Sequence, residues 1–181
     1  MARSDLAADL ARARQYGDAL SPGVHAVVVY RFGRWALQRP RAARLVLDSL
    51  YVMLAVVVRV LWGIEISRRA RIGPGLYIAH AGGIVIGPNV VIGAACNLSH
   101  DVTIGRSGHG ENYGMPVIGD DVYIAPGAKL FGKIRVGDNV KIGANAVVHR
   151  DVPDNAVVAS PGFQIVSFKG NRRRAPLQKV S

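Results

Sequence analysis

The chain has 181 residues, half of them hydrophobic and only 7% aromatic, with 21 glycines and a formal net charge of +11. This length allows one sizeable core, or a small module attached to a larger one. The positive charge could suit nucleic acid, a membrane surface or an anionic substrate, but Arg-rich patches at 39–44, 68–71 and 169–174 hold much of it. Residues 83–145 contain few Lys or Arg, so the sequence predicts no basic groove there and we expect no nucleic-acid partner.

The N-terminal part of the chain predicts helices over residues 3–16 and about 22–62. Apolar residues from Val24 onward recur at helical spacing, and Pro22 and Pro40 mark helix starts or breaks. The N-terminus lacks the long apolar run of a signal peptide. We therefore expect an α-helical region at 1–62.

Residues 45–62 are strongly apolar but are interrupted by Asp48 and Arg59. Eighteen residues is the short limit for a membrane span, so we expect a buried or interfacial helix. The helix either caps the domain that follows or, together with nearby basic residues, touches a membrane surface. The single cysteine, Cys96, excludes an internal disulfide and fits a reducing compartment. We expect a cytoplasmic protein. If the helix touches a membrane surface, the protein would lie at the inner face of that membrane.

A period of six residues dominates the chain after this helix. Fourteen aliphatic residues keep the period in three frames, namely Ile66, Ile72, Ile78 and Ile84, then Ile86, Ile92, Leu98 and Ile104, then Ile118, Ile124, Leu130, Val136, Ile142 and Val148. Each hexad predicts a short strand that ends in a turn and points its aliphatic residue inward. One hexad buries almost nothing, so coils must stack at the strand spacing of about 4.8 Å. An antiparallel sandwich would instead alternate with period two, so the sequence predicts a mainly β solenoid.

The repeat breaks at 79–83 and at 106–116, and chemistry tends to lie where a regular pattern fails. The second break is a polar, Gly-rich insertion of eleven residues, which predicts a projecting loop that acts as a lid or a subunit-bridging arm. His109 lies inside this loop, and His100 lies between the two breaks.

His80, in the first break, is the candidate general base. An imidazole can take a proton from an alcohol, and a useful base needs its other nitrogen held by an acceptor. Glu65, fifteen residues earlier, is the available carboxylate. With eighteen residues per coil, the two would lie on adjacent levels of neighbouring coils and could touch. His100 and His109 remain rival candidates, and a non-catalytic His80 also remains open.

These residues resemble the serine acetyltransferase family of the hexapeptide acyltransferases over about 5–169. The likeness rests on YRFGRW at 30–35, GIEI and ARIG at 63–73, the H-x-x-G segment of His80 and Gly83, and VTIG at 102–105. The resemblance implies a left-handed parallel β-helix at 63–160 after the helical region, with a cap and tail at 161–181. It also implies a homotrimer with active sites between subunits.

The resemblance further implies direct transfer from acetyl-CoA, with no acyl-enzyme and no metal. His80 would be the base and Glu65 its acidic partner. The coenzyme A arm would contact mainly backbone near Gly105, Ala125, Gly127, Lys141, Gly143 and Ala144, and N–H groups there could hold the developing oxyanion.

The sequence departs from the serine-using members at three positions. They have Asp where this chain has Ala79, another Asp where it has Arg12-Ala13, and an active-site His where it has Met115. The two Asp residues suit an amino-acid ammonium, so their absence leaves two acceptors open, a serine-like molecule or a sugar hydroxyl of a surface polysaccharide or its precursor. The sugar acceptor is favoured by a likeness to short, serine-acetyltransferase-like proteins, some of which are encoded beside polysaccharide gene clusters.

Two functions of other classes also stay open. A non-catalytic solenoid used for assembly or binding would predict no base at the first break and no loop at the second. A zinc hydrolase would need several ligand histidines at one level. His80 and His100, twenty residues apart, could approach each other, but no third ligand is evident in the sequence.

Overall fold

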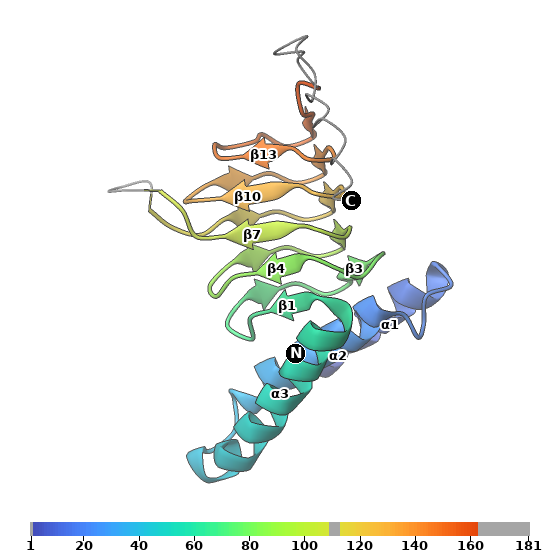
Figure 1. Ribbon diagram of the computed structural model, residues 1–181, viewed down its shortest axis with the longest axis vertical. Helices are drawn as coiled ribbons and strands as arrows, with labels where there is room; N and C mark the ends of the chain where they lie inside the picture. The colour runs from blue at the N-terminus through green and yellow to red at the C-terminus, as the bar shows by residue number, and fades with distance from the viewer. Residues whose placement is uncertain (1, 109–112, 163–181) are drawn as a thin grey trace, which may run out of the picture.

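The computed structural model describes residues 2–108 and 113–162, and Figure 1 shows the helices at one end of a stack of short strands. The helices are α1 (Ala2–Gln15), α2 (Pro22–Ala36) and α3 (Arg41–Trp62). Ser21 caps α2 by accepting a hydrogen bond from the Val24 N–H at 3.4 Å. Gly63 ends α3 in the left-handed conformation, which favours glycine. The proline between α2 and α3 separates them as the sequence predicts.

Within the described residues, fourteen strands follow α3, and each is two or three residues long, as expected of one hexad. They are β1 (Ile64–Ile66), β2 (Arg71–Ile72), β3 (Tyr77–Ile78), β4 (Ile84–Ile86), β5 (Val91–Ile92), β6 (Asn97–Leu98), β7 (Thr103–Gly105), β8 (Val117–Ile118), β9 (Tyr123–Ile124), β10 (Lys129–Phe131), β11 (Arg135–Val136), β12 (Lys141–Ile142), β13 (Val147–Val148) and β14 (Val157–Val158). They pair in parallel in three sheets, with the orders β1-β4-β7-β10-β13, β11-β8-β5-β2 and β14-β12-β9-β6-β3.

The predicted left-handed parallel β-helix after a helical region is confirmed. All fourteen aliphatic residues of the repeat are buried, at 9% exposure or less, and they form one core along the stack. Cys96 lies in this core at 0% exposure, where burial raises the pKa of its thiol to about 11. It is a packing residue of the core.

The strand register shows how many residues each of the two breaks adds to its coil. Val85 pairs with Thr103, eighteen positions on, whereas Glu65 pairs with Val85, twenty positions on. The break at 79–83 therefore adds two residues to the first coil. Further along, Val91 pairs with Val117, 26 positions on, so the insertion at 106–116 adds eight residues to a regular coil. Its base is closed by an antiparallel bridge between Ser107 and Gly114, and His109 lies outside the described residues.

A buried ion pair fastens the helices to the first coil. The Arg31 guanidinium donates to both carboxylate oxygens of Asp9, at 2.8 and 3.1 Å, and to the carbonyl oxygens of Ile72 and Gly73, at 2.7 and 2.6 Å. Asp9 also accepts from the Leu76 N–H at 2.8 Å. Because α1, α2 and the β2 region all contribute, this network fixes the helices against the base of the solenoid.

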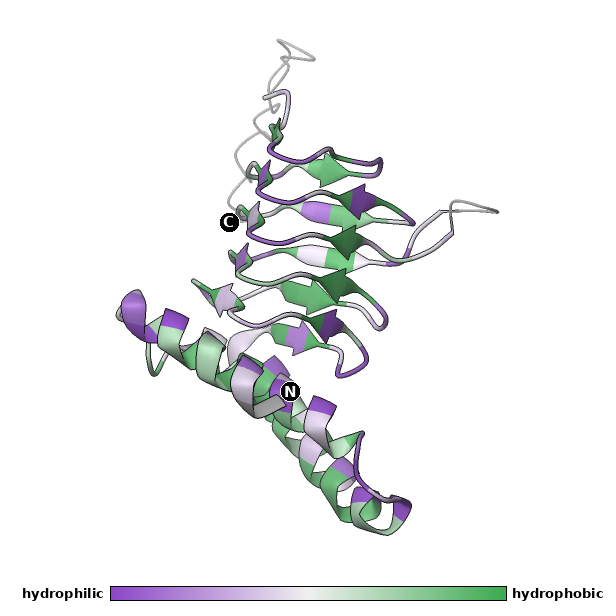
Figure 2. Cartoon of the chain, turned by 180° about the vertical axis from the view of Figure 1, so that it is seen from behind, coloured by the Kyte–Doolittle hydropathy of each residue, from purple (hydrophilic) through white to green (hydrophobic). Residues whose placement is uncertain are grey.

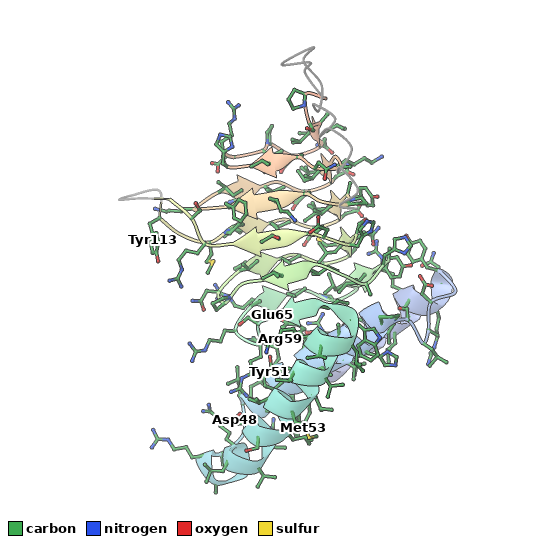
Figure 3. The ribbon with its side chains drawn as sticks, in the orientation of Figure 1. Asp48, Tyr51, Met53, Arg59, Glu65 and Tyr113 are labelled. Carbon is green, nitrogen blue, oxygen red and sulfur yellow. The ribbon has the colours of Figure 1, made fainter. Side chains whose placement is uncertain are left out.

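α3 packs on α2 and the first coil along one side only. Val58 is its buried residue, and Trp62 packs against the core. Only 6% of its most apolar stretch is buried, and by length and composition the helix could cross a membrane. Figure 2 shows apolar residues along this helix, and in Figure 3 the side chain of Met53 points away from the solenoid. Capping of the solenoid therefore accounts for one side of α3 and leaves the other side uncovered.

Candidate active site

One edge of the solenoid gathers most of the predicted site residues. It consists of the turns that follow strands β3, β6, β9 and β12, namely 79–83, 99–102, 125–128 and 143–146; we call it the His80 edge. The predicted residues on it are His80, His100, Ala125, Gly127, Gly143 and Ala144. The candidate base and most of the residues predicted to contact coenzyme A therefore lie on one line of stacked turns.

Backbone hydrogen bonds hold these turns in register. The Asp101 N–H donates to the Gly82 carbonyl at 2.7 Å, and the Gly127 N–H donates to the His100 carbonyl at 3.1 Å. One level higher, the Asn145 N–H donates to the Pro126 carbonyl at 2.9 Å. The edge is thus a continuous ladder, and a ligand along it would meet fixed backbone.

The turn that bears His80 depends on glycine. Gly82 and Gly83 have φ values of 106° and 67°, which disfavour a residue with a side chain. A Cβ on Gly83 would also lie 2.9 Å from Oδ1 and 3.0 Å from Cα of Asp101 in the next coil. These two residues let the chain make the wider turn that ends the first coil.

His80 is exposed at this turn, and its ring meets that of His100 edge to face, with 5.9 Å between centroids. The spacing of twenty residues left this approach open, and the two rings meet because the first coil has twenty residues. Beside His100, the Lys129 ammonium donates to the Asp101 carboxylate at 2.9 Å and to the Asp101 carbonyl at 2.5 Å. The sequence analysis missed this pair, although Asp101 directly follows His100.

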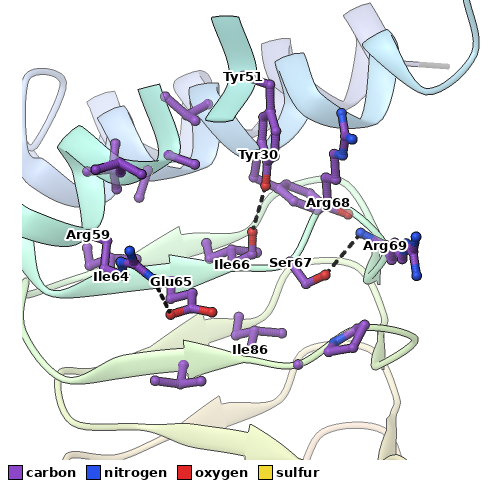
Figure 4. Close-up of a pocket in the computed structure, with 18 of the residues that line it drawn as sticks. Tyr30, Tyr51, Arg59, Ile64, Glu65, Ile66, Ser67, Arg68, Arg69 and Ile86 are labelled. Atoms are coloured by element: carbon purple, nitrogen blue, oxygen red, sulfur yellow. Dashed lines mark hydrogen bonds and ion pairs between the residues drawn. The ribbon is translucent and has the colours of Figure 1, made fainter. Parts of the chain in front are cut away.

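Glu65 does not lie where the sequence analysis expected it. Glu65 in β1 and His80 in the turn after β3 lie in the same coil, instead of on adjacent levels of neighbouring coils, because the fifteen positions between them are fewer than one coil. Glu65 projects from β1 into a groove of about 590 Å³ beside α3, where its carboxylate lies 3.8 Å from the Arg59 guanidinium (Figure 4). Glu65 and His80 both lie within the described residues and form no hydrogen bond with each other. The role of Glu65 therefore stays a prediction.

Two further predicted residues lie on a second edge, between the first and second sheets. Gly105 ends β7 there, and the insertion begins directly after it. Met115 is half-buried against the core at the end of the insertion. The Arg106 guanidinium donates to the Tyr113 hydroxyl at 2.9 Å, across the base of the insertion. We call this the loop edge; within one chain it is a different corner from the His80 edge.

Lys141 is exposed on the outer face of the third sheet, one residue before the end of β12. On the same face, Tyr77 donates a hydrogen bond to Asp18 from the turn after α1, and its ring stacks on Tyr16 at 4.4 Å. Burial, followed by the contact with Asp18, raises the pKa of Tyr77 to about 12, so the phenol stays protonated as a donor. No sequence pattern connects this pair, because the two residues are 59 positions apart.

The backbone N–H groups predicted near the coenzyme A arm are largely engaged in the ladder. The Ala125 N–H donates to Ile142 at 2.9 Å, and the Gly143 N–H donates to Val158 at 2.7 Å. Gly127 donates to His100, as described above. An oxyanion would therefore need other donors than these three.

The positions that depart from the serine-using pattern offer no carboxylate. Ala79 is half-buried and donates its N–H to the Leu98 carbonyl at 3.0 Å. Arg12 donates to the Gly75 carbonyl at 3.3 Å, and Ala13 is buried. Within residues 2–108 and 113–162, no three His, Cys, Asp or Glu side chains gather as a metal site.

Comparisons with known proteins give the family. Residues 115–150 match the model described as bacterial transferase hexapeptide (six repeats). The serine acetyltransferase of Helicobacter pylori is 42% identical over 134 residues, which cover 74% of this chain and 75% of that protein. The chain belongs to the serine acetyltransferase family.

Other serine acetyltransferases support this placement. That of Mycobacterium tuberculosis is 41% identical over 145 residues, 80% of this chain and 61% of the relative; the chain thus spans about three fifths of the length of that protein. The solved serine acetyltransferase of Neisseria gonorrhoeae in complex with serine superposes with a TM-score of 0.71, at 32% identity over 90% of this chain and 68% of that one. The predicted family resemblance is confirmed.

Proposed function

We propose that the protein is an acetyl-CoA-dependent O-acetyltransferase that transfers the acetyl group directly to a hydroxyl, with His80 as the general base. The observation that carries the proposal is the place of His80, exposed on the same line of turns as Gly127 and Gly143. Membership of the serine acetyltransferase family supports it.

In the proposed step, the acceptor hydroxyl attacks the thioester carbonyl while an imidazole nitrogen of His80 removes its proton. The new C–O bond forms and the C–S bond breaks, and the proton then passes from the imidazolium to the coenzyme A thiolate. The products are an O-acetyl ester and the free thiol. Because His100 lies against the His80 ring, we propose that it positions the base rather than replacing it.

We further propose a homotrimer in which the loop edge of one subunit faces the His80 edge of the next. The two edges lie at different corners of each coil, so Gly105 and Met115 can join His80 only across a subunit boundary. The coenzyme A arm would then lie between the edges, along Ala125, Gly127, Gly143 and Ala144, with Lys141 close by on the outer face of β12.

For the acceptor, we propose two classes. The family favours serine or a serine-like small molecule. A sugar hydroxyl of a surface polysaccharide or its precursor is favoured by a specific observation: at Ala79, Arg12-Ala13 and Met115 the chain offers neither the carboxylates that would hold an ammonium nor the second histidine. Asp18 lies within the described residues and accepts a hydrogen bond from Tyr77. If the acceptor is an amino acid, we expect the Asp18 carboxylate to contribute to its binding.

The experiment is a thiol-release assay on the purified protein with acetyl-CoA and a panel of acceptors, including serine, homoserine and simple sugars. We expect release above the rate without acceptor for at least one hydroxyl compound, with the ester found by mass spectrometry. If serine is used, Asp18→Asn should raise its KM. If no alcohol releases thiol and calorimetry detects no coenzyme A binding, the proposal is wrong, and a non-catalytic solenoid remains.

A further inference from the structure

α3 carries an uncovered apolar face along most of its length. Nine apolar side chains on it are exposed at 39 to 77%, namely Leu45, Val46, Leu50, Val52, Met53, Val56, Val57, Val60 and Leu61. At 100° per residue these side chains occupy one half of the helix circumference. Val58, which is 5% exposed, lies on the opposite half, against α2 and the first coil.

Ser49 is the polar residue on this face, and the charged side chains of α3 lie on the other half of the helix. The Ser49 hydroxyl donates to a carbonyl of its own helix at 3.0 Å, which is how a serine satisfies its hydroxyl in an apolar medium. Asp48 turns to Arg68 of the first coil, at 2.5 Å, and Arg59 turns to Glu65. Figure 3 shows Asp48 and Met53 on opposite sides of the helix.

Positive charge gathers where the face begins. Residues 32–47 include four arginines and no acidic residue; of these arginines, Arg44 lies 3.8 Å from the Asp48 carboxylate. The Arg39 guanidinium lies 4.9 Å from the ring centroid of Trp35, which is 37% exposed. Arginine and tryptophan at the end of an apolar helix are typical of contact with the headgroup layer of a membrane, and arginine is attracted to anionic lipids.

We propose that α3 lies in the interface of an anionic lipid bilayer, with its uncovered face among the acyl chains and the arginines of 34–44 at the headgroups. The helix lies on the membrane and does not cross it, because its other side packs on α2 and the first coil. Gly63 also joins α3 directly to β1, so the solenoid must stay close to the end of the helix, on the aqueous side.

A second copy of the chain fits this face less well than a bilayer does. Pairing two α3 helices in parallel would bring the arginines at 34–44 of both copies together. Antiparallel pairing would bring them to the end that carries Arg59. In addition, a protein interface has a polar rim with hydrogen bonds around its core, whereas the half of α3 described above offers only Ser49, whose hydroxyl is already bonded.

The test is co-sedimentation of the purified full chain with vesicles of phosphatidylcholine, with and without about 30% phosphatidylglycerol as the anionic lipid. We expect binding to the mixed vesicles, weaker binding to phosphatidylcholine alone, and weakening by salt. Val60→Glu should lower the partition coefficient on the order of tenfold. Val147→Glu is the matched control, since Val147 is 61% exposed on β13 and Val60 is 73% exposed, and it should bind like the wild type. Arg39→Gln with Arg41→Gln should weaken binding only to the anionic vesicles.

Two results would overturn the proposal. The first is a wild-type chain that stays in the supernatant with the mixed vesicles. The second is a Val60→Glu variant that binds vesicles normally but loses subunits in size-exclusion chromatography with light scattering, because the face would then be covered by a second copy. Circular dichroism of both valine variants shows whether either change unfolds the protein.

Discussion

The ion pair of Asp9 and Arg31 should be the most sensitive contact between the helices and the solenoid. Asp9 is 3% and Arg31 is 4% exposed, and five hydrogen bonds join them to each other and to the first coil. Asp9→Ala removes the carboxylate that Arg31 bonds directly, and leaves the buried guanidinium with two carbonyl partners and the more distant carboxylate of Asp5. Asp5→Ala is the matched control, because Asp5 faces the same guanidinium at 3.6 Å but its side chain is 28% exposed.

The two variants should differ several-fold in their effect on stability. Removing one partner of a buried pair costs about 3–5 kcal/mol, whereas an exposed pair at this distance contributes about 0–1 kcal/mol. For a chain of this size each kcal/mol shifts Tm by roughly 2–4 °C. We therefore expect Asp9→Ala to lower Tm by about 6–20 °C and Asp5→Ala by no more than about 4 °C.

The assay is thermal unfolding of the wild type and both variants at one protein concentration, since assembly makes Tm depend on concentration. Adding Arg31→Met to Asp9→Ala should recover part of the loss, because the unpaired charge is then gone. If Asp9→Ala and Asp5→Ala unfold within about 2 °C of each other, the burial of this pair is not what fastens the helices.

Three further changes test other parts of the structure. Cys96, with its thiol pKa raised to about 11 by burial, should not react with a thiol reagent at pH 8 during the time in which the chain reacts fully in guanidinium; rapid labelling of the folded protein would contradict its place in the core. Gly83→Ala should lower the free energy of unfolding by about 2–5 kcal/mol, because the new Cβ would clash with Asp101 in addition to the strain of a positive φ. Gly17→Ala has the same strain in open space and should lower it by only about 1–2 kcal/mol, as measured by denaturant unfolding. Glu65→Gln should lower turnover less than loss of the base does, and an unchanged rate would remove Glu65 from the mechanism.

The solenoid could be predicted because each inward position demands the same kind of residue. Ile86, Ile104 and Leu130 occupy equivalent places in three coils, and each is exposed by 1% or less. A period of six in aliphatic residues has few other physical explanations. The helix boundaries at Pro22 and Pro40 followed from backbone sterics in the same way.

Contacts between elements could be predicted only in part. The approach of His80 to His100 was suggested by their spacing, but Glu65 was assigned to the wrong level, because the fifteen positions from Glu65 to His80 do not complete one coil. The pairs of Asp9 with Arg31 and of Tyr77 with Asp18 join the helical region to itself and to the solenoid, and no periodicity connects such positions. Composition showed that α3 is apolar, but not which half of it would be covered.

Turnover of His80→Asn beside His100→Asn tests the central claim most directly, since the two rings touch on the same edge but only one is proposed to take the proton. With the best acceptor of the panel, we predict that His80→Asn lowers kcat by about 10²–10⁴-fold, with the oligomeric state and coenzyme A binding retained. His100→Asn should lower kcat far less. Equal losses, or a larger loss for His100→Asn, would contradict His80 as the base.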